Sequence, residues 1–169
     1  MTAIVVADTS VLINFLRIDR MDLLGRYPSH FLATDHVAGE IEAREQRVRF
    51  NAAVTEGIIE TCVVNDPKEV ELYMRLDPGR RLGHGECSAI AVALNRGYHL
   101  AIDDNKALSR ALREAPLANA KLHILRTPDL IVALIRSGVL TIVEADRIKD
   151  DWGRHHRFRI KAASFDELL

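Results

Sequence analysis

Short apolar runs, separated by stretches with helical spacing, constrain the fold of this chain more than any other feature. The first run, residues 3–7, is wholly apolar and rich in β-branched residues, which predicts a strand buried on both faces. Further strands are predicted at residues 30–33, 58–64, 98–102 and 122–125. Strands that alternate with helices pair in parallel through right-handed crossovers, and the helices then cover both faces of one sheet. The pattern therefore predicts an α/β fold.

The helices expected between these strands have recognisable start and stop residues. They are predicted behind Ser10 as N-cap, at 36–57 in two pieces, from Pro67, at 85–94, from Asp104 through Arg113, from Thr127 to Ser137, and at 142–152. The 169 residues contain no internal repeat and no Gly/Ser linker. We therefore expect a single domain over residues 1–169, with a core at about 3–140 and a C-terminal helix and basic tail at about 141–169.

Composition excludes several classes of protein. Apolar residues make up 48% and charged residues 28%, as in a soluble folded chain. The longest apolar stretches, such as 130–135, are too short to span a bilayer. We expect no signal segment at the start of the sequence, because Asp8 interrupts the first apolar run. Two cysteines, Cys62 and Cys87, exclude a disulfide scaffold and a thiolate zinc site. We expect a cytoplasmic protein with no membrane partner.

The charges are nearly balanced, with 23 basic and 24 acidic residues and a net charge of −1. The field of the whole molecule therefore cannot concentrate polyanions. A nucleic-acid partner would need a local basic surface or metal ions to offset its phosphates.

Several carboxylates are predicted at the carboxyl edge of the sheet, where sites form in open parallel sheets. Asp8 follows the first strand, and Asp103 and Asp104 follow the fourth. Glu40 comes after the second strand, and Glu86 begins the Ala-rich helix. If the first and fourth strands are neighbours, these carboxylates face one cleft and repel one another unless they bind a hard cation such as Mg²⁺ or Mn²⁺. Such a cation can activate water for phosphodiester hydrolysis.

Each of these carboxylates also has a purely structural interpretation. Asp8 and the Asp103–Asp104 pair could form turns or cap helices. Glu40 could pair with Arg44 on the surface, and Glu86 could simply favour the positive end of its helix. Spacing alone leaves the two interpretations open.

Four segments in order resemble the motifs of PIN-domain ribonucleases. They read IVVADTSVLIN at 4–14, VAGEI at 37–41, LGHGECSAIA at 82–91 and LAIDDNKAL at 100–108. The region 127–140 is similar to the closing helix and turn of one branch of that family. The resemblance covers most of the chain.

The resemblance implies a three-layer α/β/α sandwich around a parallel sheet and an acidic Mg²⁺ or Mn²⁺ site that cleaves RNA. It implies that Asp8, Glu40, Glu86 and Asp104 form the acidic set, with Asp103 as a near-equivalent of Asp104, and that Ser10 and Asn14 support the metal site. The second motif is poorly defined, so Asp35 or Glu42 are alternatives to Glu40. Many relatives are VapC-type toxins, which implies an antitoxin partner and a homodimer.

Basic residues offer candidate RNA contacts. The segment 152–161 is the most basic part of the chain and includes Arg154 and Arg157, with Trp152 or Phe158 available to stack on a base. The alternative is a solvated final strand or tail with Phe158 and Ile160 turned inward. Arg44 and Arg81 lie near the acidic motifs and are further candidates.

The leading hypothesis is a metal-dependent endoribonuclease, as the toxin of a toxin–antitoxin pair or as a housekeeping enzyme. The alternative is a catalytically silent RNA- or protein-binding module on the same fold, because a fold does not fix a function.

Overall fold

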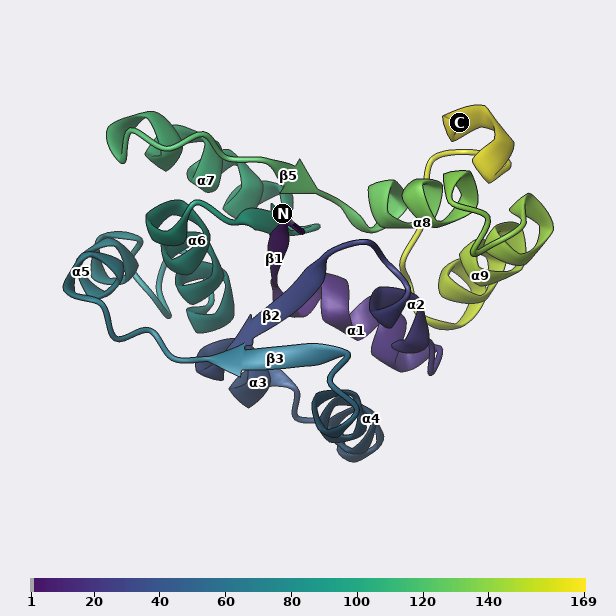
Figure 1. The fold of residues 1–169 in the computed structure, drawn as a ribbon, viewed down its shortest axis with the longest axis horizontal. Helices are drawn as coiled ribbons and strands as arrows, with labels where there is room; N and C mark the ends of the chain where they lie inside the picture. Colours follow the sequence, from purple (N-terminus) through teal and green to yellow (C-terminus); the bar gives the residue numbers. More distant parts are fainter. Residues whose placement is uncertain (1) are drawn as a thin grey trace.

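A computed structural model describes residues 2–169 and contains one five-stranded parallel sheet in the order β3-β2-β1-β4-β5 (Figure 1). The strands are β1 (Ile4–Ala7), β2 (His30–Thr34), β3 (Ile59–Cys62), β4 (His99–Ala101) and β5 (Ile124–Leu125). The predicted α/β class is confirmed. β1 and β4 are neighbours in parallel register, with Val6 opposite Leu100, so the two strands followed by aspartates end at the same edge of the sheet.

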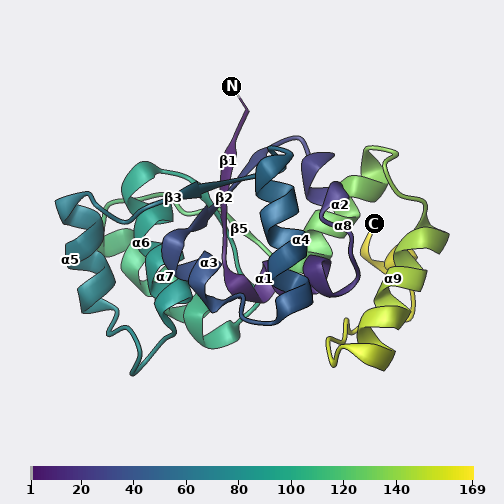
Figure 2. The ribbon, with the colours of Figure 1, turned by 90° about the horizontal axis from the view of Figure 1, so that it is seen from below.

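Helices flank the sheet. They are α1 (Thr9–Arg17), α2 (Asp22–Gly25), α3 (Asp35–Glu40), α4 (Arg44–Thr55), α5 (Pro67–Arg75), α6 (His84–Arg96), α7 (Asn105–Leu117), α8 (Thr127–Arg136), α9 (Ile142–His155) and the 3-10 helix η1 (Phe165–Leu168). In Figure 1, α5, α6 and α7 lie to one side of β1, and α1, α2, α8 and α9 lie to the other. Figure 2 shows α5 and α9 at opposite ends of the molecule. Among the described helices, none is long and apolar enough to cross a bilayer.

One predicted helix start is wrong. The N-cap of α1 is Asp8 and not Ser10, because the Asp8 carboxylate accepts the Ser10 backbone N–H at 3.2 Å. An aspartate in this position satisfies one of the free N–H groups of the first turn. The carboxylate at the end of β1 is therefore fixed by the helix that follows it.

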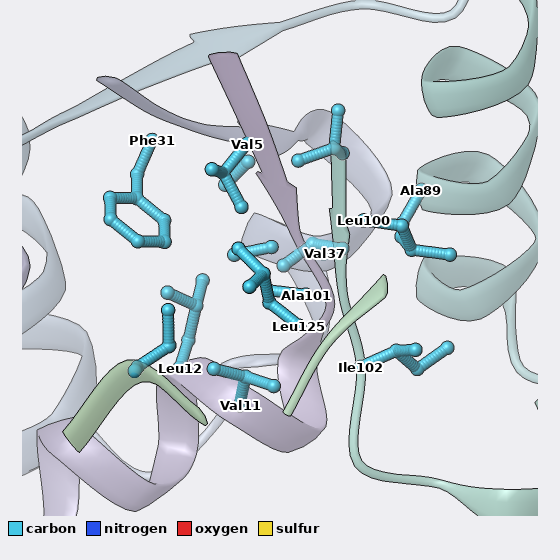
Figure 3. Close-up of a cluster of buried hydrophobic side chains, with 14 of the residues drawn as sticks. Val5, Val11, Leu12, Phe31, Val37, Ala89, Leu100, Ala101, Ile102 and Leu125 are labelled. Atoms are coloured by element: carbon cyan, nitrogen blue, oxygen red, sulfur yellow. The ribbon is translucent and has the colours of Figure 1, made fainter. Parts of the chain in front are cut away.

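The core lies between the sheet and its helices. Figure 3 shows Val5 and Leu100 from the central strands, Val11 and Leu12 from α1, and Ala89 from α6, all fully buried. The small alanines of α6 allow this helix to pack closely on β1, β2 and β4. Close packing holds the N-terminus of α6, with Glu86, beside the carboxyl edge of the sheet.

A buried ion pair joins α5 to α6. The carboxylate of Glu69 is fully buried and accepts hydrogen bonds from Arg96 Nε at 2.6 Å and Nη2 at 3.1 Å, with Asn95 Nδ2 at 3.3 Å. A carboxylate removed from water in this way depends on its partner.

The C-terminal region packs on α1 through Trp152. This side chain is fully buried, meets Phe15 edge-on with ring centroids 5.9 Å apart, and donates from Nε1 to the backbone oxygen of Asn14 at 2.8 Å. Trp152 is therefore unavailable for stacking on an RNA base, and that prediction is wrong. No strand forms in segment 152–161 either, while Phe158 and Ile160 pack partly buried against the core.

Candidate metal-binding carboxylate site

Asp8 directly follows β1, which is the central strand of the sheet. Its backbone N–H donates to Ala101 O at 2.9 Å, and its Oδ2 accepts from Ser10 N and from Ser10 Oγ at 2.7 Å. The residue is 1% exposed, and its Oδ1 is buried with no hydrogen-bond partner among the described residues. Burial raises the pKa of Asp8 from 3.8 to about 6, against the opposing effect of the Ser10 hydrogen bonds, and the negative charge of Glu86 adds to the rise. An ionised Asp8 is thus desolvated and incompletely paired.

Ser10 connects the ends of β1 and β4. Its Oγ donates to Asp8 and accepts the backbone N–H of Asp103 at 3.1 Å. One hydroxyl therefore fixes the spacing between two of the predicted acidic positions.

Asp103 is enclosed by donors from α1 and α8. Its Oδ2 accepts from Asn14 Nδ2 at 3.0 Å and from Thr127 Oγ1, and its Oδ1 accepts the Thr127 N–H at 2.9 Å. Arg126 donates to the Asp103 backbone oxygen, and its Nε lies 3.8 Å from Oδ1. Burial raises the pKa of Asp103, and these hydrogen bonds oppose that rise. Both carboxylate oxygens of Asp103 already have protein partners.

Asp104 is the N-cap of α7. Its Oδ1 accepts the Ala107 N–H at 2.8 Å, while its Oδ2 accepts no hydrogen bond from residues 2–169. The structural interpretation of Asp104 as a helix cap is thus correct, yet one oxygen stays free to bind a ligand.

Glu86 lies in the first turn of α6 and accepts the Gly83 N–H at 2.8 Å. Burial raises the pKa of Glu86, and the charges of Asp104 and Glu40 raise it further. Because Glu86 in turn raises the pKa of Asp8, the four carboxylates are electrostatically linked.

Glu40 turns toward α1 and α6. Its Oε2 accepts from Thr9 Oγ1 at 2.6 Å and its Oε1 accepts the Gly85 N–H at 2.8 Å. Among the described residues no ion pair joins Glu40 to Arg44, so the surface pair considered from the sequence does not form. A Cβ at residue 85 would collide with the Glu40 carboxylate and lie 2.9 Å from Thr9 Oγ1. Only glycine at this position leaves room for Glu40.

The donor set fits a hard divalent cation. Asp8 Oδ1 lacks a partner, and Glu86 and Asp104 each use a single oxygen in a helix cap. Mg²⁺ and Mn²⁺ prefer such oxygen donors and retain several waters. Within residues 2–169, the structure contains no group of three His, Cys, Asp or Glu side chains that are close enough together to hold a metal ion. Mutual repulsion of like charges opposes closer grouping without a cation.

The remaining predicted residues lie outside this cluster. Asp35 begins α3 beside His36, at 3.2 Å from its Nδ1, and Glu42 is exposed. The candidate RNA contacts are all exposed. Arg44 lies on α4, Arg81 lies in the loop before α6, Arg154 lies on α9, and Arg157 follows α9. Arg126 and Thr127 contact Asp103 directly, although the sequence indicated only a helix start there.

Comparison with curated proteins found no match for this chain. A family model described as a PIN domain matches residues 4–169, which is nearly the whole chain. With the parallel sheet and the acidic residues at its carboxyl edge, this match shows that the chain belongs to the PIN domain family.

Proposed function

We propose that this protein is a divalent-metal-dependent endoribonuclease that hydrolyses RNA phosphodiester bonds. The observation that carries the proposal is the buried Asp8 carboxylate, which has one oxygen without a partner among the described residues. The charge of Glu86 raises the pKa of Asp8, and the charges of Asp104 and Glu40 in turn raise the pKa of Glu86. A carboxylate of this kind is costly to ionise and gains a partner when a cation binds. Membership of the PIN domain family supports the same activity.

Within this proposal, Asp8, Glu86 and Asp104 would hold the cation, because each presents an oxygen without a protein partner. When bound, Mg²⁺ or Mn²⁺ supplies an activated water and offsets the charge that develops on the phosphate. Ser10 orients Asp8, while Asn14 and Thr127 hold Asp103 so that the start of α7 stays in place. Glu40 fixes the N-terminus of α6 beside the site through the Gly85 N–H.

The test is cleavage of single-stranded RNA by wild-type protein and by Asp8→Asn. A matched control is Asp66→Asn, because Asp66 is also an N-cap aspartate that accepts a backbone N–H, at 2.9 Å, but lies exposed at α5. Wild type and the control should cleave RNA with Mg²⁺ or Mn²⁺ and stop when EDTA is added. Asp8→Asn should lose activity by about 100-fold or more while remaining folded.

Cleavage that persists in EDTA, or full activity of Asp8→Asn, would contradict the metal mechanism. RNA binding without cleavage by the metal-loaded wild type would favour the catalytically silent module instead.

We further propose that the nuclease acts as a toxin, and the resemblance to VapC-type toxins supports this role. Expression of the wild type should then arrest growth of a bacterial host, and expression of Asp8→Asn should not. An antitoxin partner and a homodimer follow from the same resemblance. Equal growth with both proteins would count against the toxin role and leave the nuclease activity open to the direct assay.

A further inference from the structure

A cavity opens beside Asp103 on the side facing the C-terminal tail. Its volume is about 380 Å³. It lies between the residues that follow β4 and β5 and the residues that follow α9, and its walls include Asp103, Asn105, Arg126, Phe158, Arg159 and Lys161.

The cavity is positively charged, although the protein as a whole carries a net charge of −1. Arg126, Arg159 and Lys161 bring three cationic groups, against the single carboxylate of Asp103. That carboxylate already accepts hydrogen bonds from Asn14 and Thr127. Among the described residues Arg159 and Lys161 form no ion pair, and both are exposed. Their charges are therefore available to a ligand.

The chemistry of the walls suits a nucleotide unit. Guanidinium and ammonium groups bind phosphate oxygens, and Arg does so in a fork geometry. Phe158 is partly buried against Trp152, with ring centroids 5.4 Å apart, and so offers a supported apolar surface beside these cations. Grooves that bind single-stranded RNA combine the same two elements, cations for the backbone and an aromatic face for a base.

We infer that this cavity is a subsite for the nucleotide adjoining the scissile phosphodiester of single-stranded RNA. Arg126, Arg159 and Lys161 contact the phosphates that flank this nucleotide, and Phe158 contacts its base. The inference rests on the proposed function, because Asp103 is shared between the cavity wall and the acidic site. It replaces Arg154 and Arg157 as the main basic contacts of the tail, since neither lines the cavity.

The test compares two double variants in the cleavage-deficient Asp8→Asn background. One is Arg159→Ala/Lys161→Ala. The other, Arg113→Ala/Lys121→Ala, also removes one arginine and one lysine. Both are exposed and form no ion pair in residues 2–169, and neither lines the cavity. Binding of a fluorescent single-stranded oligoribonucleotide is measured by anisotropy over a series of salt concentrations, and thermal unfolding checks that each variant is folded.

Loss of two phosphate contacts should weaken binding by about tenfold or more at 0.1 M salt and reduce the slope of log K against log salt by about 1.4. The Arg113/Lys121 control should keep the parental slope. Equal effects of the two double variants would overturn the subsite while leaving the nuclease proposal intact. Displacement of the RNA by an acidic peptide of equal charge, at equal concentration, would assign the cavity to a protein partner and also overturn it. If Asp8→Asn does not bind RNA and the metal-loaded wild type does not cleave it, both the subsite and the nuclease proposal are overturned.

Discussion

Replacing Asp8 by Asn should stabilise the metal-free protein above neutral pH, although it removes the central residue of the proposed site. Asp8 is buried, and its pKa rises from 3.8 to about 6 on folding. Below pH 3.8 the folded and unfolded states are both protonated at this residue. Between pH 3.8 and about pH 6 the folded state keeps a proton on Asp8 that the unfolded state releases. The free energy of unfolding therefore falls as the pH rises through this range.

The magnitude follows from the two pKa values. A pKa difference between 3.8 and about 6 corresponds to about 3 kcal/mol of stability, fully lost above pH 6. Asn keeps the N-cap hydrogen bond from Ser10, since Asn and Asp cap helices equally well. Its amide nitrogen takes the place of Oδ1 and lacks a partner there, at a cost of about 1 kcal/mol. Asp8→Asn should therefore be more stable than wild type by about 2 kcal/mol at pH 8.

The assay is urea unfolding of wild type, Asp8→Asn and the Asp66→Asn control in EDTA, at intervals from pH 4 to pH 8. The free-energy difference between wild type and Asp8→Asn should grow with pH and level off above pH 6, while Asp66→Asn tracks the wild type. Added Mn²⁺ should then stabilise the wild type more than Asp8→Asn. A pH-independent difference, or a wild type that is the more stable protein at pH 8 in EDTA, would refute the reasoning.

Two further substitutions separate function from stability. Gly85→Ala displaces the Glu40 carboxylate, so RNA cleavage should fall by about tenfold or more. Its unfolding free energy should change by only about 1 kcal/mol, since alanine is the better helix former and the displaced group is the flexible end of a half-exposed side chain. Gly39→Ala, which meets no atom within 4 Å, is the control, and equal activity of the two variants would contradict the role of Gly85. Arg96→Met leaves Glu69 buried without its cation and should cost about 3 kcal/mol or more in urea unfolding, whereas a cost within experimental error would show that the pair contributes no stability.

The sequence was sufficient to predict the sheet and the edge at which the acidic residues meet. Asp8 and Asp103 directly follow short apolar runs, and parallel strands end on a common side, so the sequence predicts that both residues lie at one edge of the sheet. Their proximity also requires β1 and β4 to be neighbours, which only the strand order of the structure shows. The helix start at Ser10 was misassigned because both Asp8 and Ser10 are good caps, and only the backbone direction after β1 decides between them.

Other features depend on packing that no local pattern records. Asp103 and Thr127 are separated by α7 and β5, so their hydrogen bond arises only when β4 and β5 pair. The inward turn of Glu40 requires the space left by Gly85, which lies 45 residues away along the chain. Trp152 stood in a basic segment and suggested a surface role, but the apolar surface of Phe15 gives it a buried position.

The hydrogen bond from the Asp8 amide to Ala101 has a consequence for how the acidic cluster withstands disturbance. This amide continues the ladder between the central strand β1 and its neighbour β4, so the backbone of Asp8 cannot loosen by fraying of a loop or a terminus. The backbone of Asp8 is therefore displaced only if the middle of the sheet opens. The centre of the acidic cluster should therefore stay intact until the whole domain melts.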